Sequence, residues 1–233
     1  MNLTKKLKNM GYDLIDGPIR NHKNLQLWEQ KPMNKIGLYH SKLQDALISD
    51  VQLNVLETPA LDIDSTTKNE YKFNLGITVL EGVLESLNLG DLGLDTKIKS
   101  GKKVSISYDK SVTREIPIGE INHYLSDSDF TYTNAQLLKN LNRDNLIIVT
   151  GVLLSKNLVV QIDSDLAIDS ELAASLNSSV NGKLEFSATS SNSLSMKSTG
   201  DSYFPVAVKA YRIDYDKGVF NKTTLVTDNR KFF

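Results

Sequence analysis

The sequence predicts an α+β protein in one domain, with a long, twisted, mostly antiparallel β-sheet flanked by short helices. Two observations predict the sheet: apolar and polar residues alternate over residues 92–108, and they alternate again over residues 158–198. A third observation predicts the helices, because several segments outside these runs change to the spacing of one helix face. The 233 residues suffice to bury a core, and no linker or repeat of fixed period divides them.

The N-terminal segment is predicted to be helical over residues 3–10, because Leu3, Leu7 and Met10 have helical spacing. Three basic residues lie beside that apolar face: Lys5, Lys6 and Lys8. They fit a docked helix with a solvated face. They also fit a small patch for anionic lipid, in which each lysine contributes about 1 kcal/mol.

Residues 11–108 are predicted to form short strands and loops first, then longer elements. Residues 46–56 indicate a strand pair or one bent strand, and Trp28 indicates a core or edge anchor. Residues 69–77 alternate as a half-buried strand, and residues 79–90 change to helical spacing. The run 92–108 then returns to alternation, with a turn or bulge at Ser100 and Gly101. Its apolar face carries Leu92, Leu94, Ile98, Val104 and Ile106.

Residues 116–157 are predicted to contain two helices and the central strand. Pro117 and Gly119 indicate a turn before a short helix, and residues 133–144 indicate a second helix capped by Thr133 or Asn134. Residues 145–160 form the most continuously apolar run. This run predicts a central strand, with a turn near residues 155–157.

The stretch 158–198 is predicted to form two long strands around a short helix at 171–180. The even positions are apolar at Val160, Ile162, Leu166, Ile168, Leu184, Phe186, Leu194 and Met196. The odd positions carry the charges: Asp163, Asp165, Asp169, Lys183 and Glu185. Polar residues interrupt the even face at Ser164, Ser170, Ser190 and Asn192. A last strand over residues 203–216 leads to a tail.

Composition limits the classes of function. A net charge of −1 gives no signal for nucleic acid, and the absence of cysteine excludes disulfides, thiolate metal sites, a cysteine nucleophile and palmitoylation. The N-terminus lacks the apolar run of a signal peptide, and no window approaches the roughly 20 apolar residues of a spanning helix. We therefore expect a soluble, cytoplasmic protein as synthesised.

Catalytic signatures are missing from the sequence. His22, His40 and His123 are scattered and have no acidic neighbour at ligand spacing. Neither G-x-S-x-G nor H-E-x-x-H occurs. We therefore expect no enzyme activity, no metal and no cofactor.

The alternating runs allow two interpretations. Membrane β-strands need about 9–11 alternating residues, and the regions 92–108 and 158–198 each supply two such stretches. Hairpins can enter lipid only within a closed barrel, so many copies of this chain would have to join. The same alternation also describes an antiparallel sheet with one packed face and one wet face.

Four segments carry a resemblance to a known family. In chain order they are "LKNMGYDLI", "VSISYDKSVTREIPIGEINHYL", "NLIIVTGVLLSKNLVVQID" and "FPVAVKAYRIDYDKG". Together they resemble the bacterial gasdermins over nearly the whole length. The resemblance rests on segment order more than on one invariant motif.

The resemblance implies a pore-forming mechanism. Two regions, about 69–108 and 158–198, would extend into amphipathic hairpins, and many copies would form a large barrel in the inner membrane. The apolar positions named above would face lipid, and the charged odd positions would line the lumen. Cell death that stops phage is the implied outcome.

The resemblance also divides the chain into a pore-forming domain, residues 1–218, and a short inhibitory tail, residues 219–233. An associated protease would remove the tail, and from position alone we place the cut within residues 215–225. The tail residues that could dock are Val219, Phe220, Leu225, Val226, Phe232 and Phe233.

Two departures from the family leave alternatives open. Bacterial gasdermins commonly carry a palmitoylated cysteine near the N-terminus, whereas here only Lys5, Lys6 and Lys8 could prepare membrane insertion. Some fungal relatives act by pairing with a variant partner and not by cleavage.

The competing interpretation is a non-enzymatic, β-rich binding module that uses the Ser/Thr-rich face of residues 183–199. A hydrolase comes third, because no nucleophile–base pair is visible.

Overall fold

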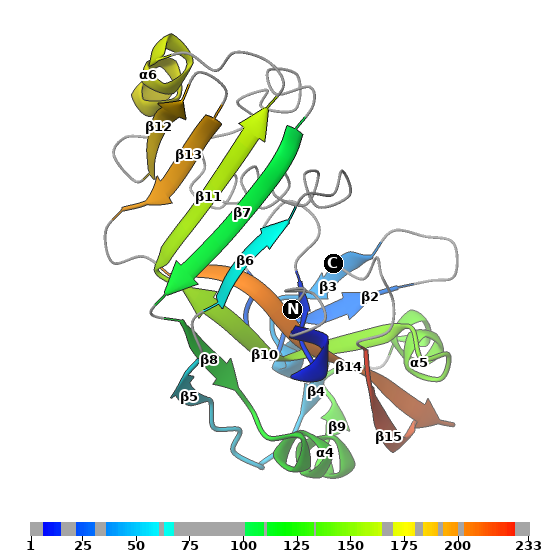
Figure 1. Ribbon diagram of the computed structural model, residues 1–233. Coiled ribbons are helices and arrows are strands. Elements are labelled where there is room, and N and C mark those ends of the chain that lie inside the picture. Colours follow the sequence, from blue (N-terminus) through cyan, green and yellow to red (C-terminus); the bar gives the residue numbers. More distant parts are fainter. Residues whose placement is uncertain are drawn as a thin grey trace.

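The computed structural model of the chain confirms an α+β fold built on antiparallel sheets (Figure 1). The structure describes residues 7–14, 22–30, 36–60, 63–67, 101–109, 111–132, 134–164, 170–179, 184–190, 193–199 and 203–226. Its strands form an eight-stranded sheet, a five-stranded sheet and a two-stranded sheet. The five-stranded sheet extends away from the larger one (Figure 1).

The eight-stranded sheet contains β1 (Asp13–Leu14), β2 (Leu27–Glu29), β3 (Gly37–His40), β5 (Leu56–Pro59), β8 (Val112–Glu115), β10 (Leu146–Ser155), β14 (Phe204–Asp216) and β15 (Val219–Leu225). The five-stranded sheet has the order β12 (Leu184–Ser190), β13 (Ser193–Ser198), β11 (Asn157–Ser164), β7 (Gly101–Asp109) and β6 (Ile63–Thr67). The two-stranded sheet pairs β4 (Leu47–Ile48) with β9 (Asp129–Phe130).

Strand β10 is the centre of the fold, as its continuous apolar run predicts. All ten of its residues are buried. It pairs with β14 along one side and with β2 and β8 along the other. Because both edges of β10 carry partner strands, β10 is an interior strand of the sheet.

The described helices are α4 (Ile118–Asp127), α5 (Ala135–Leu141), α6 (Ser170–Ser179) and the 3-10 turn η1 (Leu43–Asp45). Helix α4 starts after Pro117 and buries Ile121, Tyr124 and Leu125 in the core beside β10. Helix α5 is capped by Asn134, whose side chain accepts a hydrogen bond from the Gln136 amide at 2.7 Å. This cap confirms one of the two predicted positions.

The turn predicted near residues 155–157 is a bend at residue 156, where the chain passes from β10 in the eight-stranded sheet to β11 in the five-stranded one. The single strand predicted over 183–197 is wrong, because β12 and β13 pair as a hairpin. Serine and asparagine, both turn formers, occupy positions 191 and 192. The alternation survives because the register pairs even positions with even ones, such as Phe186 with Met196.

Other predictions are refined by the structure. The segment 46–56 is neither a strand pair nor one bent strand, because β4 pairs with β9 and β5 pairs with β8. Trp28 is buried beside His22, with ring centroids 5.0 Å apart, as expected of a core anchor. Residues 7–9 are helical, and Leu7 is fully buried. The predicted elements over 69–77, 79–90 and 92–100 lie outside the described residues.

Gly151 provides a test of packing at the centre of the fold. A Cβ atom there would lie 3.0 Å from Glu115 Cγ, 3.1 Å from Tyr12 Oη and 3.2 Å from Lys209 Cβ. We expect Gly151→Ala to lower the free energy of unfolding by about 1–3 kcal/mol, as overpacking does elsewhere. Urea unfolding measures this change.

The matched control for that substitution is Gly119→Ala, because a Cβ atom at Gly119 meets nothing within 4 Å. We expect this control to be as stable as the parent or slightly more stable. A Gly151→Ala chain with parental stability would show that its three neighbours can move apart.

Candidate functional site

The five-stranded sheet has one apolar face, because the alternation of its strands is in phase across their pairing. One row joins Phe186, Met196, Val160 and Ile106, and the next joins Ala188, Leu194, Ile162 and Val104. Each row contains only even positions from four strands. Positions far apart in the sequence therefore lie on one surface, which we call the even face.

Most described side chains of the even face are buried in this state, and Ala188 is partly buried. Val160, Leu184, Phe186, Leu194 and Met196 are each exposed by 2% or less. Helix α6 packs on β12 and buries Ala173 and Leu176. Of the other predicted apolar positions, Val104, Ile106 and Ile162 share the face by register, and Leu92, Leu94, Ile98, Leu166 and Ile168 lie outside the described residues.

The opposite face of the same sheet is polar, and we call it the odd face. Glu185 is paired directly with Lys197, and both side chains are exposed. Asp163 accepts a hydrogen bond of 2.5 Å from Ser193 Oγ. Opposite charges across neighbouring strands favour this pairing. Asp165, Asp169 and Lys183 lie outside the described residues.

A side chain that sequence reasoning missed lies at the outer edge of this sheet. Asn177, on α6, donates from Nδ2 to the Phe186 carbonyl oxygen at 2.7 Å and accepts from the Phe186 amide at 2.7 Å. A single asparagine in a serine-rich helix gives no signal in the sequence. Only the packing of α6 against β12 brings the two residues together.

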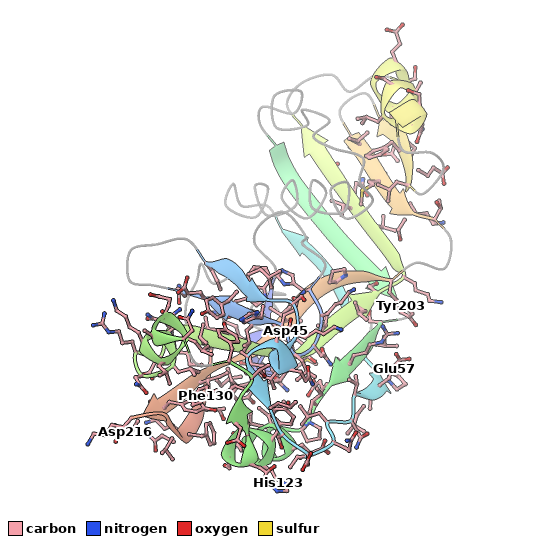
Figure 2. All side chains as sticks on the ribbon, turned by 180° about the vertical axis from the view of Figure 1, so that it is seen from behind. Asp45, Glu57, His123, Phe130, Tyr203 and Asp216 are labelled. Carbon is pink, nitrogen blue, oxygen red and sulfur yellow. The ribbon has the colours of Figure 1, made fainter. Side chains whose placement is uncertain are left out.

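The predicted tail begins as a strand of the eight-stranded sheet. β15 pairs with β14 through a tight turn at Lys217 and Gly218, both of which have positive φ (51° and 84°). Figure 2 shows Asp216 at the outer end of this hairpin. Successive side chains of a strand point to opposite faces, so the tail side chains lie on two sides of β15.

The side chains of the predicted tail divide between packed and exposed positions. Phe220 is half-buried against the core, with its ring centroid 5.7 Å from that of Tyr215. Val226 is buried, and its amide donates to the Ala210 oxygen at 3.0 Å. Val219 and Leu225 face outward, with exposed fractions of 70% and 39%. Phe232 and Phe233 lie outside the described residues.

A polar cluster lies next to the end of this tail strand. Tyr12 Oη donates to a Glu115 carboxylate oxygen, and Lys209 Nζ lies 3.1 Å from the other oxygen. Burial and the hydrogen bond to Glu115 raise the pKa of Tyr12. A Cβ atom built on Gly11 would lie 2.9 Å from Lys209 Cε and 3.6 Å from Leu225 Cδ2. The N-terminal segment and the tail therefore meet beside β14.

The other predicted basic and histidine positions are separate from one another. Lys8 lies in the N-terminal helical turn and is partly exposed, whereas Lys5 and Lys6 are outside the described residues. His40 lies 2.8 Å from Tyr132 Oη, and burial raises the pKa of the adjacent Tyr39 to about 12. His123 is exposed on α4 (Figure 2).

The described residues contain neither a metal-binding cluster nor a membrane-spanning helix. Over these residues, no group of three or more histidine, aspartate or glutamate side chains is placed to hold a metal ion. No described helix has the length and hydropathy needed to cross a lipid bilayer.

Known proteins resemble this chain in sequence and in fold. The sequence model of the bacterial gasdermin family matches residues 15–219. A gasdermin, bGSDM, from a Desulfuromonadales bacterium is 24% identical over 217 residues, which are 91% of this chain and 81% of that protein. The solved structure of a bacterial gasdermin from Bradyrhizobium tropiciagri has a TM-score of 0.57 at 14% identity, covering 94% of this chain and 90% of its own.

Proposed function

The chain belongs to the bacterial gasdermin family, whose members are of the pore-forming type, and we propose that it forms a β-barrel pore in a lipid membrane once its tail is removed. The even face would meet hydrocarbon, and Asp163, Asp165, Asp169, Lys183 and Glu185 would line the water-filled lumen. The inactive form would be soluble in the cytoplasm, and the pore would lie in the inner membrane. Pore opening would kill the cell and so defend against phage.

The in-phase alternation of the five-stranded sheet carries this proposal. A barrel needs strands whose apolar side chains all face outward while all backbone groups are paired. The registers of β7, β11, β13 and β12 already supply such a surface. In the inactive form these side chains are buried, and helix α6 packs on β12.

Insertion also requires longer strands, since about 9–11 residues cross a bilayer. β7 has 9 residues and β11 has 8, whereas β12 has 7 and β13 has 6. The sequence continues the alternation beyond β11, at Leu166 and Ile168. We therefore propose that α6 unfolds and that residues 165–183 become strand.

The tail is proposed to hold the inactive form because it completes an edge of the eight-stranded sheet. β15 covers β14 over residues 211–216, and Phe220 and Val226 pack against the body. The turn at Lys217 and Gly218 is an accessible point within the proposed cleavage region, 215–225. Exposed loop tips are the preferred sites of proteolysis. An associated protease is therefore a proposed partner.

Membrane attachment without a cysteine is proposed to begin at the N-terminal lysines. Lys5, Lys6 and Lys8 together supply about 3 kcal/mol at an anionic surface. This attraction alone is weak, so it would act together with assembly of many copies.

A second candidate function is a binding module that uses the odd face. Glu185, Ser187 and Lys197 are exposed on neighbouring strands and could contact a polar partner. This alternative predicts a monomer that ignores lipid under every truncation.

Dye release from liposomes tests the proposal with two forms of the chain, the full length and one that ends at Lys217. We expect only the shortened form to release dye, because removing β15 opens the edge of β14. Leakage by both forms would place control outside the tail. Two folded proteins that release no dye would refute the pore and favour the binding module.

A further inference from the structure

Strand β12 is one of the two outer strands of the five-stranded sheet. One of its edges pairs with β13, and no described strand pairs with the other, whose backbone donors and acceptors could pair with a further strand. Exposed edges of this kind cause unwanted association, and proteins commonly cover them. Here α6 lies against β12 at that end of the sheet (Figure 1).

Asn177 covers the middle of this edge by imitating a strand. Its amide group bonds both the carbonyl oxygen and the amide of Phe186, each at 2.7 Å. A side-chain amide offers the same donor and acceptor as a peptide group. We call this pair of hydrogen bonds the Asn177 clamp. While it is closed, no other strand can pair with Phe186.

The clamp depends on an element of low intrinsic stability. α6 has 10 residues, five of them serine or asparagine, which favour caps and turns over helix interiors. An isolated helix of this length is marginal in water. Besides Asn177 itself, the described side chains that hold α6 in place are Ala173 and Leu176, which are buried. The clamp can therefore open when these contacts loosen.

We infer that the outer edge of β12 is the surface on which a second copy of this chain adds a strand, and that the Asn177 clamp blocks this edge in the inactive form. The inference rests on the proposed pore function. It adds a control point that is separate from the tail, because β15 pairs with β14 in the other sheet.

The even and odd faces argue for a second copy as the occupant. A strand added to β12 must continue an apolar face and a polar face in phase with Phe186 and Glu185. Strand β12 of a second copy carries that alternation, and among the described strands it pairs on one edge with β13 alone. A strand without it would place charged groups on the apolar side or apolar groups in water.

Substitution of Asn177 tests the inference on the full-length chain. We expect Asn177→Ala to raise the rate of self-association, followed by light scattering, about tenfold, since two hydrogen bonds that compete with pairing are lost. Ser178→Ala is the matched control, because Ser178 is the next residue of α6 and bonds only the Ser175 oxygen of its own helix. We expect the control to associate at the parental rate.

Hydrogen exchange at the Phe186 amide shows whether the clamp has opened. Faster exchange in Asn177→Ala together with an unchanged association rate would overturn the inference.

A second substitution tests the inference if Asn177→Ala is too unstable for its association rate to be compared with that of the parent. Because the Phe186 amide faces outward, the Ala188 amide two residues on faces the same way. Proline at Ala188 removes this outward donor, and outward-facing edge positions tolerate proline. We expect Ala188→Pro to fold and to slow association at least about tenfold. Association of Ala188→Pro at the parental rate would overturn the inference.

The two proposals fail in different ways. In one outcome the parent chain leaks dye after tail removal, and both variants associate at the parental rate. This outcome refutes the proposal that β12 mediates association and leaves the pore proposal intact. A parent chain that never leaks refutes the pore. Light scattering then still reports whether β12 mediates association.

Discussion

Lysine in place of Ala188 is expected to abolish dye release by the tail-shortened chain, whereas lysine in place of Ser187 is expected to leave it unchanged. Ala188 is partly buried on the even face opposite Leu194, and Ser187 is exposed on the odd face opposite Ser195. A lysine facing hydrocarbon costs about 2–4 kcal/mol at the bilayer midplane, and every copy in a barrel carries that cost. A lysine facing the lumen stays in water.

The two variants are matched in charge and differ by one position along the same strand. Any attraction of the added lysine to anionic lipid is common to both, so only the face differs. Ala188 also suits the test better than Leu184, which is 2% exposed, because a charge at Leu184 would disturb the inactive fold as well. Circular dichroism should show both variants folded. Equal leakage by both would contradict the assignment of the even face to lipid.

Alanine in place of Phe220 is expected to make the uncleaved chain leak. The Phe220 ring is half-buried against Tyr215 and the core, and its removal loses about 0.8–1.5 kcal/mol of apolar burial. Because 1.4 kcal/mol is a factor of ten, the detached population of the tail should rise about 3- to 10-fold. The rate of dye release by full-length protein should rise with it.

Val219→Ala is the control for this prediction. Val219 is the preceding residue of β15 and is 70% exposed, so its truncation removes little packing. We expect Val219→Ala to stay as inactive as the parent. Limited proteolysis at the Lys217 turn reports tail detachment independently of membranes. Faster proteolysis of Phe220→Ala without any leakage would show that the tail can leave without opening a pore.

The local patterns predict the elements of this fold well, because each pattern reflects the geometry of its own segment. Continuous apolar residues over 146–155 belong to a strand buried along its whole length. Asn134 caps α5 because its side chain reaches the amide of a residue two positions along the chain. The alternation of β12 and β13 predicts a two-faced sheet because successive side chains of a strand point to opposite faces.

The sequence by itself therefore determined the central strand β10, the helices α4, α5 and α6, the two faces of the smaller sheet and the family. The tertiary structure decided which strands meet, and it corrected the strands predicted over 46–56 and over 183–197. It also placed Phe220 against Tyr215 and Asn177 against the Phe186 backbone. The physical reason is range: periodicity is fixed by local backbone geometry, whereas strand partners depend on contacts between segments far apart in the chain. An edge strand and the helix that covers it can be recognised only once those contacts have formed.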